Sequence, residues 1–380
     1  MTRGLAALAG LCVAYAALYY QAQLGNVWRS GDFAALWSYG QILHTGGAAA
    51  LYDPDRLQAL QTDLGLPADE RNPFPYPPGF LLAIWPLGLV PFGAGFVAWI
   101  IVTLGLYLWA CRGRLGWLAV VAPGTTIGVV AGQTGFLTGA LFLGGLRLVA
   151  TRPWLGGALL GLLTIKPQLG VLIPVALTAA RAWRAMAAAA LAASALTTVS
   201  LLVFGPGALG QWLESLPGYA AIFAGRSVRY GMMPTVTANL TMLGVPGVTP
   251  LQAAATLAAA ALVWVTWRPS TVDPAEVGPA EVGPAEVGPA GPGSRAWLIL
   301  ATATFLATPH AFVYDMPLLT GAALLYGSGD PRSRAGVVAA VLVLPAAMLW
   351  SGPVPLSTPV LAALVAALWL GGKPRRVSTA

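Results

Sequence analysis

The sequence has few charged residues, two histidines and two cysteines. Charged side chains make up 9% of its 380 residues, whereas 57% are hydrophobic, and the mean hydropathy is +0.73. No soluble domain of this length has such a composition, so we expect a polytopic membrane protein. Cys12 and Cys111 lie inside or at the end of apolar segments, so neither a disulfide framework nor a cysteine metal site is indicated.

The signatures of common soluble enzymes are also missing. The sequence has no P-loop, no GxGxxG after a strand, no HExxH and no GxSxG. The net charge of +7 does not form a basic cluster with interleaved aromatics, so a nucleic-acid partner is excluded.

Most basic residues fall in short gaps between apolar runs or at the termini, on one side of the expected membrane. The positive-inside rule makes that side cytoplasmic. These residues are Arg3, Arg112, Arg114, Arg147, Arg152, Arg181, Arg184, Arg268, Arg295, Arg332, Arg334, Lys373, Arg375 and Arg376. The most suggestive polar groups, Asp32, His310 and Asp315, then lie outside. So do the other basic residues, which are Arg29, Arg56, Arg71, Lys166, Arg226 and Arg229. We therefore expect any chemistry at the outer face.

Apolar runs of membrane-spanning length predict an all-α bundle of about twelve crossings, with both termini inside. Residues 5–24 are taken as an uncleaved first helix, because the run is long and no clear cleavage site follows. The run 77–111 is too long for one crossing, so 77–90 is expected to dip into the outer leaflet and 92–111 to cross. The remaining crossings are expected at about 115–131, 134–150, 155–166, 168–180, 185–204, 251–267, 296–308, 312–327, 335–350 and 358–372.

Two longer polar stretches are expected outside, 25–76 and 205–250. The first contains a surface helix over 51–66, and the second a short apolar helix near Asn239. Residues 274–288 are three copies of PAEVG, whose recurring proline and glycine indicate a disordered cytoplasmic linker. The chain then divides into a membrane core over 1–268, a linker over 269–295 and C-terminal helices over 296–380.

Two outer motifs each have two interpretations. In Gly31-Asp32-Phe33, Asp32 is either the N-cap of a helix over 33–44 or an ionised group at the membrane surface that accepts a hydroxyl proton or holds a cation. In Phe74-Pro75-Tyr76-Pro77-Pro78, the prolines either begin the dipping helix or form a rigid wall that places Tyr76 over a lipid or sugar.

Gly132-Gln133 and Lys166-Pro167-Gln168 fall at outer helix ends. Lys166 either snorkels to the headgroups or binds an anion, for which phosphate is the obvious candidate. Arg226 and Arg229 are the other outer cations in the second half of the chain.

Thr308-Pro309-His310 and Tyr314-Asp315-Met316 form the densest polar spot of the C-terminal half. His310 has the chemistry of a proton acceptor, and Asp315, about one helical turn further on, would orient or charge its ring. No second histidine or cysteine is near, so zinc is not expected. No cofactor is required by these motifs, although a divalent cation held by Asp32 and Asp315 remains an alternative.

In order and spacing these motifs resemble the polyprenyl-phosphate-sugar-dependent glycosyltransferases of family 87, over residues 28 to about 330. The motifs that carry the resemblance are GDF (31–33), LYDP (51–54), FPYPP (74–78), GQ (132–133), KPQ (166–168) and TPHAFVYDM (308–316).

The resemblance implies a GT-C fold in a bacterial cytoplasmic (inner) membrane, with an outer active site. It also implies a polyprenyl-phosphate-mannose donor and a lipid or glycan acceptor. Asp32 and His310 would then be catalytic, and Lys166 and Gln168 would lie near the donor phosphate. Gln133, Tyr76, Arg226, Arg229, Asn239 and Asp315 complete the expected substrate-binding set.

The main alternative is a transporter or lipid flippase of envelope precursors. Transporters often show internal repeats and broken helices around a midplane site. We find no repeat of that kind, and the candidate groups lie at helix ends.

Overall fold

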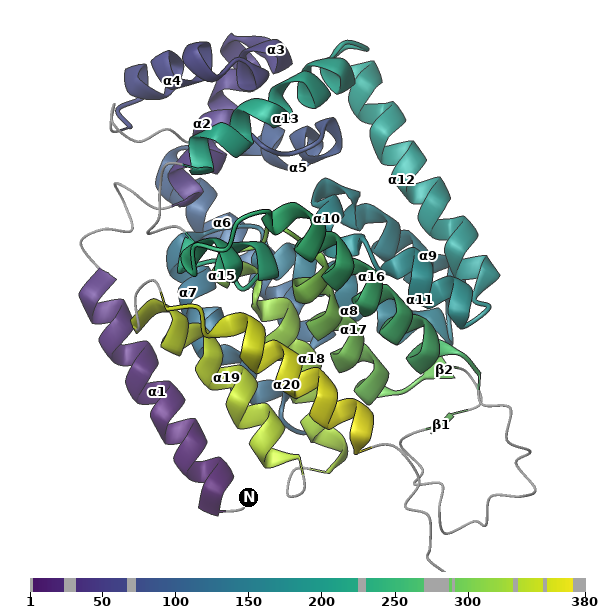
Figure 1. Ribbon diagram of the computed structural model, residues 1–380. Coiled ribbons are helices and arrows are strands. Elements are labelled where there is room, and N and C mark those ends of the chain that lie inside the picture. The colour runs from purple at the N-terminus through teal and green to yellow at the C-terminus, as the bar shows by residue number, and fades with distance from the viewer. Residues whose placement is uncertain are drawn as a thin grey trace, which may run out of the picture.

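The computed structural model describes residues 3–23, 32–66, 73–224, 230–269, 287–288, 291–330, 334–350 and 354–371, and these are almost entirely helical (Figure 1). The predicted all-α class is therefore confirmed for the described part of the chain. The exception is one antiparallel pair of two-residue strands, β1 (Val287–Gly288) and β2 (Gly291–Pro292). This pair lies in the segment 269–295 that was predicted to be a disordered linker. Most of that segment lies outside the described residues.

The first half of the chain forms a group of short helices followed by a bundle. Its elements are α1 (Arg3–Gln23), α2 (Asp32–Thr45), α3 (Gly47–Tyr52), α4 (Pro54–Asp63), η1 (Pro78–Phe80), α5 (Leu81–Ile84), η2 (Trp85–Leu89), α6 (Phe92–Ala110), η3 (Gly116–Val120), α7 (Pro123–Ala131), α8 (Gly135–Val149), α9 (Pro153–Gly161), η4 (Leu162–Ile165), α10 (Pro167–Gly170) and α11 (Ile173–Ala179).

The second half completes the bundle. Its helices are α12 (Trp183–Phe204), α13 (Ala208–Ala224), α15 (Val236–Met242), α16 (Val248–Trp267), α17 (Ser294–Ala307), η5 (Val313–Asp315), α18 (Pro317–Gly329), α19 (Ala335–Trp350) and α20 (Ser357–Leu370).

Most boundaries agree with the apolar runs, and the differences follow from proline. The helix expected over 312–327 begins only at Pro317, because residues 313–315 form the separate turn η5. The surface helix expected over 51–66 is α3 followed by α4, with Asp53 as the N-cap between them and Pro54 in the first turn. The stretch 77–90 is a series of short turns, η1, α5 and η2.

Three described helices are both long and apolar enough to cross a membrane: α6, α12 and α16. Eight further apolar segments of 10–17 residues are shorter. Some are shortened by internal breaks: α9 continues as η4, and the run 167–179 is divided into α10 and α11. The protein is thus a membrane protein by its apolar helices, whereas the count of about twelve crossings stays a prediction.

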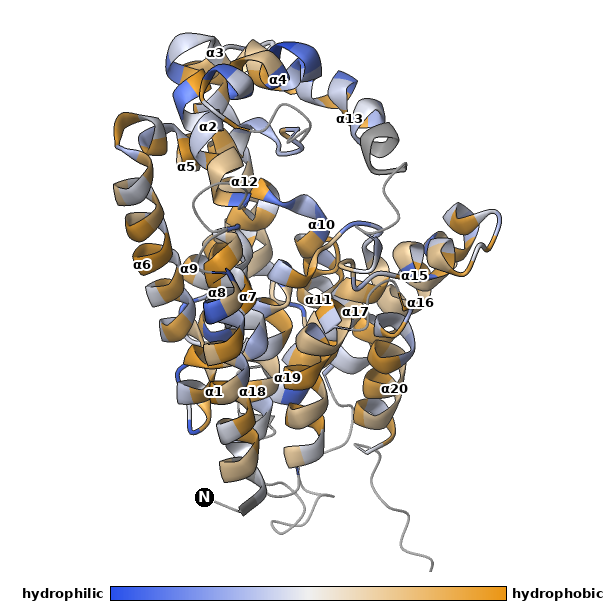
Figure 2. Cartoon of the chain, turned by 90° about the vertical axis from the view of Figure 1, so that its left-hand side faces the viewer, coloured by the Kyte–Doolittle hydropathy of each residue, from blue (hydrophilic) through white to orange (hydrophobic). Residues whose placement is uncertain are grey.

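Five helices gather at one end of the bundle. In Figure 1, α2, α3, α4, α5 and α13 lie at the top, whereas the N-terminus and β1 and β2 lie at the bottom. Figure 2 shows hydrophobic residues along the bundle helices and hydrophilic ones on α4. We call the end with α3, α4 and α13 the cap end.

Three arginine side chains donate to carbonyls at or just after helix ends. The guanidinium of Arg147 donates to the carbonyl of Arg112 at 2.7 Å, that of Arg295 to Leu368 at 2.9 Å and that of Arg334 to Tyr326 at 3.0 Å. The last carbonyls of a helix have no partner within it, so these bonds satisfy groups that lipid would leave unpaired.

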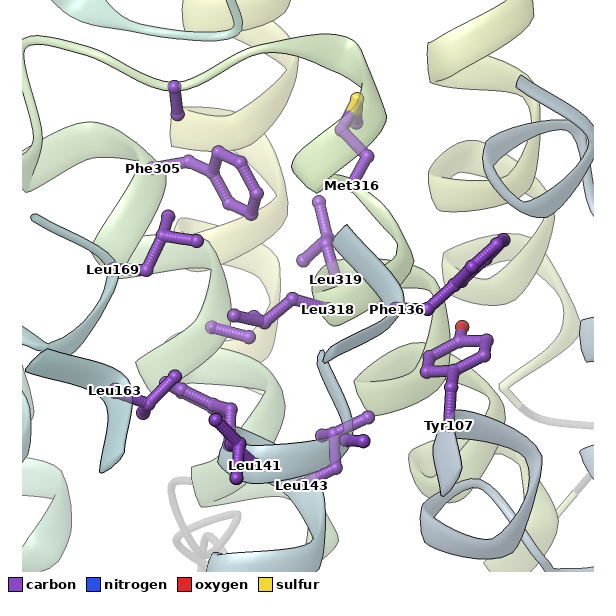
Figure 3. Close-up of a cluster of buried hydrophobic side chains, with 14 of the residues drawn as sticks. Tyr107, Phe136, Leu141, Leu143, Leu163, Leu169, Phe305, Met316, Leu318 and Leu319 are labelled. Atoms are coloured by element: carbon purple, nitrogen blue, oxygen red, sulfur yellow. The ribbon is translucent and has the colours of Figure 1, made fainter. Parts of the chain in front are cut away.

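One cluster of the buried core lies between α8 and α18 (Figure 3). Phe136 and Tyr107 lie together there, with ring centroids 5.6 Å apart. The Tyr107 hydroxyl donates to the carbonyl of Pro317, the first residue of α18, at 2.8 Å. The buried Met316 and Leu318 fix the same stretch from below. The polar residues of η5 are therefore followed directly by a buried and hydrogen-bonded helix start.

Candidate functional site

A buried ion pair joins two of the predicted motifs. The Lys166 ammonium lies 2.5 Å from Oδ1 of Asp315, and the two side chains are 5% and 0% exposed. Oδ2 of Asp315 accepts from the backbone amide of Phe312 at 3.0 Å, so both carboxylate oxygens are engaged. An ion pair away from water is costly unless its remaining hydrogen-bonding groups are satisfied. This one has such partners.

Proline explains how Lys166 reaches this place. Residue 166 follows the 3₁₀ turn η4 and precedes Pro167, which disfavours helical backbone angles at the residue before it. Its φ and ψ are −142° and 73°, so the chain turns sharply between η4 and α10. The Lys166 amine also lies 3.5 Å from the hydroxyl of Thr134 and 5.1 Å from the ring centroid of Tyr314.

The turn Gly132–Gly135, between α7 and α8, is where the motifs meet. Gly132 has a positive φ of 64°, and a Cβ on it would lie 2.5 Å from the Cβ of Phe33. A Cβ on Gly135 would overlap the carbonyl oxygen of Tyr314. Only glycine therefore allows the start of α2 and the turn η5 to approach this turn from two sides. We call residues 132–135 the hub turn.

Between these glycines, Gln133 and Thr134 provide the polar contacts. The Tyr76 hydroxyl donates to Oε1 of Gln133 at 3.0 Å, and the same oxygen accepts from the amide of Thr134 at 3.2 Å. The hub turn thus links FPYPP to KPQ through adjacent side chains.

Asp32 is placed beside this cluster by its neighbour. It is the first residue of α2, and the next residue, Phe33, packs on Gly132. Burial, and then the negative charges of Asp315 and Asp32, raise the pKa of the Tyr76 hydroxyl. Burial and then Asp32 raise the pKa of Tyr314. Asp32 therefore lies within electrostatic reach of both tyrosines, and both interpretations of it, cap and reactive carboxylate, remain compatible with its place at the helix start.

His310 lies in the loop between α17 and η5, five residues before Asp315. Its half-buried ring meets Phe312 edge-on at 5.1 Å, and Phe312 stacks on Tyr314 at 5.1 Å. Burial lowers the pKa of His310 to about 4; the charge of Lys166 also lowers it, and Asp315 opposes the shift. At neutral pH the imidazole is therefore uncharged and has an acceptor nitrogen.

Other predicted residues lie elsewhere or outside the description. The Asn239 amide donates to the Ser357 hydroxyl at 2.8 Å and accepts from the amide of Thr358 at 3.2 Å, so it ties α15 to the start of α20. We therefore leave Asn239 out of the site. Gln168 is half-buried in α10, two residues from Lys166. Arg226 and Arg229 lie outside the described residues.

A cation between Asp32 and Asp315 would have to compete with Lys166, which already neutralises Asp315. Within the described ranges, no group of three or more histidine, cysteine or acidic residues is arranged to hold a metal.

Sequence reasoning missed the roles of Thr134 and the ring of Tyr314. Both are adjacent to residues that it did select, Gln133 and Asp315. A hydroxyl directly after a selected glutamine was a usable signal. The approach of the Tyr314 carbonyl to Gly135 gave no signal in the sequence, since it depends on packing between α8 and η5.

Comparison with known proteins supplies one match. The sequence model of glycosyltransferase family 87 matches residues 74–285, which is more than half of the chain. No curated protein and no solved structure matches. The matched range includes Tyr76, Gln133 and Lys166, whereas Asp32 and His310 lie outside it.

Proposed function

The chain belongs to glycosyltransferase family 87, and we propose that it transfers a hexose, mannose, from a polyprenyl-phosphate donor to a lipid or glycan acceptor. The observation that supports this proposal best is the buried Lys166 ammonium. It lies among Asp315, Thr134 and Tyr314 near the cap end. A lipid phosphate is an anionic leaving group that needs a cation in a place of low water content.

The ion pair with Asp315 defines how Lys166 would act. An ammonium has three N–H donors, and Asp315 takes one of them. In the donor complex we assign a second to a phosphate oxygen, with the Thr134 hydroxyl beside it. Asp315 then orients the ammonium, and charge builds on the phosphate as the glycosidic bond breaks.

The acceptor hydroxyl attacks the anomeric carbon from the face opposite the phosphate. A C–O bond forms to the acceptor, the C–O bond to the phosphate breaks, and that electron pair stays on the phosphate oxygen. The hydroxyl proton goes to a protein base. Attack from the opposite face inverts the anomeric centre.

We assign the base to Asp32 and an acceptor hydrogen bond to His310. An imidazole is normally favoured as a base by a pKa near neutrality, and the pKa of about 4 removes that advantage from His310. A carboxylate also offsets the positive charge that develops at the anomeric carbon. The charge of Asp32 also contributes to the raised pKa of Tyr76 and Tyr314, which places it near both residues.

We further propose that the cap end faces the outside of the cytoplasmic membrane and that both chain ends face the cytoplasm. The N-terminus and β2 lie at the end opposite the cap (Figure 1), and Arg295 follows β2 after two residues. The positive-inside rule makes that end cytoplasmic. Polyprenyl-phosphate sugars would then be used on the outer side.

The test is transfer by the purified protein in lipid nanodiscs. Polyprenyl-phosphate-mannose, the corresponding glucose lipid and nucleotide sugars are each offered with lipid and glycan acceptors, and donor loss and product mass are followed. The proposal predicts consumption of a polyprenyl-phosphate sugar only. Use of a nucleotide sugar, or no consumption of any lipid-linked donor, would contradict it.

A further inference from the structure

Four aromatic side chains donate to four consecutive carbonyls, those of residues 73–76, at the start of the FPYPP segment. The Tyr39 hydroxyl donates to the carbonyl of Pro73 at 2.8 Å, and the Tyr52 hydroxyl to that of Tyr76 at 3.2 Å. The indole N–H of Trp212 donates to Pro75 at 3.2 Å, and the Tyr219 hydroxyl donates to Phe74. The donors come from α2, α3 and α13, so every carbonyl from 73 to 76 has a side-chain partner.

The sequence of the segment explains why such partners are needed. Proline has no amide hydrogen, and prolines occupy positions 73, 75, 77 and 78. An extended proline-rich run makes no internal hydrogen bonds. Phe74 and Tyr76 are nevertheless buried, so their carbonyls need other donors. The aromatic donors meet this requirement.

The two donors of α13 share one face of that helix. Trp212 and Tyr219 are seven residues apart, which is about two helical turns. On the other side of α13, Glu214 and Pro217 are exposed. The side that carries Trp212 and Tyr219 therefore points toward the FPYPP segment, and α13 also packs against α3 at the cap end (Figure 1).

The segment in turn positions one hydroxyl of the site. The Tyr76 ring packs on Phe80 with centroids 4.3 Å apart, and its hydroxyl donates to Gln133 in the hub turn. A shift of the 74–76 backbone would therefore move this hydroxyl relative to Gln133 and Thr134.

We propose that Trp212 and Tyr219 are positioning residues of the transferase. By fixing the carbonyls of Pro75 and Phe74, they hold the Tyr76 hydroxyl on the hub turn beside Lys166. The helix α13, part of the predicted outer stretch 205–250, would then help to position Tyr76, which is far from it in the sequence. Its catalytic part rests on the function proposed above, whereas its structural part does not.

The deciding variant is Tyr219→Phe, which keeps the ring and removes one donor, with Trp212→Phe as the second variant. The matched control is Tyr15→Phe, because the buried Tyr15 hydroxyl on α1 has no partner among the described residues. Hydrogen exchange of residues 74–84 is measured in nanodiscs without substrate. The proposal expects faster exchange in Tyr219→Phe and Trp212→Phe and none of that change in Tyr15→Phe. Unchanged exchange in both test variants would overturn it, whether or not a substrate has been found.

Kinetics with polyprenyl-phosphate-mannose test the catalytic part. We expect Tyr219→Phe to lower kcat about tenfold, with a small change in KM. In a Tyr76→Phe background, Tyr219→Phe should lower kcat hardly any further, because its effect passes through the Tyr76 hydroxyl. A full additional loss in that background would show that Tyr219 acts independently and would overturn the positioning role. If the wild-type protein transfers no sugar, the proposed function fails. The hydrogen-exchange result alone then decides the structural part of the positioning proposal.

Discussion

At the residue scale, the site depends on a few side chains whose environment was not visible in the sequence. Lys166 had two interpretations, snorkelling to the headgroups or anion binding. In the structure it is almost fully buried against Asp315, and this ion pair favours anion binding over snorkelling. The sequence selected both residues but not their pairing, because they are 149 positions apart and nothing local brings them together.

The pair makes Lys166→Ala alone a poor test, since it leaves a buried carboxylate without its cation, at a cost of about 3–5 kcal/mol. We predict that the double variant Lys166→Ala/Asp315→Ala is more stable than Lys166→Ala, measured as the thermal midpoint in nanodiscs. Its transfer rate should still be about 10²–10³ lower than wild type, because the phosphate loses its cation. Near-normal transfer by a folded double variant would make the pair purely structural.

Gly135 provides a second test at this scale. We predict that Gly135→Ala displaces the Tyr314 carbonyl and thereby Asp315, lowering stability by about 1–3 kcal/mol and reducing transfer. Gly105→Ala is the matched control, because a Cβ at Gly105 of α6 meets no atom within 4 Å. Equal behaviour of the two variants would mean that the contact of Gly135 with η5 is not needed.

At the element scale, the apolar runs predicted most helices to within a few residues, because burial in lipid and helix formation require the same pattern. The stretch 313–315 was the clearest error. There the apolar run continues into α18, but Pro317 begins the helix and the residues before it form η5. For the FPYPP segment the sequence left two interpretations, a helix start and a rigid wall. The segment does precede η1, and it is also held by donors from three helices, which no local pattern reveals.

The turn that carries His310 predicts a pH dependence. Its pKa is lowered from 6.5 to about 4, so the folded protein binds this proton more weakly than the unfolded chain. The contribution of neutral His310 to the free energy of unfolding is complete above about pH 6.5 and is lost as the pH falls toward 4. We predict that the thermal midpoint of the wild type falls between pH 7 and 5 by more than that of His310→Gln. Identical pH profiles of the two proteins would contradict this. The ring faces Phe312, and Lys166 and Asp315 are the charges that act on it.

At the scale of the whole molecule, charge asymmetry predicted which segments share an end. The structure places the N-terminus and β1 and β2 together, away from α3, α4 and α13 (Figure 1). The charge pattern did not predict that α2 and η5 meet at the hub turn. This meeting depends on two glycines that let α2 and η5 approach one turn from opposite sides.

The orientation of the bundle is tested by labelling. We predict that an impermeant thiol reagent applied from outside modifies a cysteine introduced at the exposed Ala59 of α4 and leaves one at Ala285 unmodified. The native Cys12 and Cys111 are buried and give a low background. The reverse pattern would remove the outer-face mechanism.

The central claim is that Asp32 takes the acceptor proton in a transfer from a polyprenyl-phosphate sugar, and Asp32→Asn tests it most directly. Asparagine caps a helix about as well as aspartate, so folding should be retained, but the amide has almost no basicity. The measurement is product formation from polyprenyl-phosphate-mannose alongside binding of that donor. The account predicts normal donor binding and a transfer rate lower by at least about 10²–10⁴. A folded Asp32→Asn protein with near-normal transfer would contradict it and leave Asp32 as a helix cap.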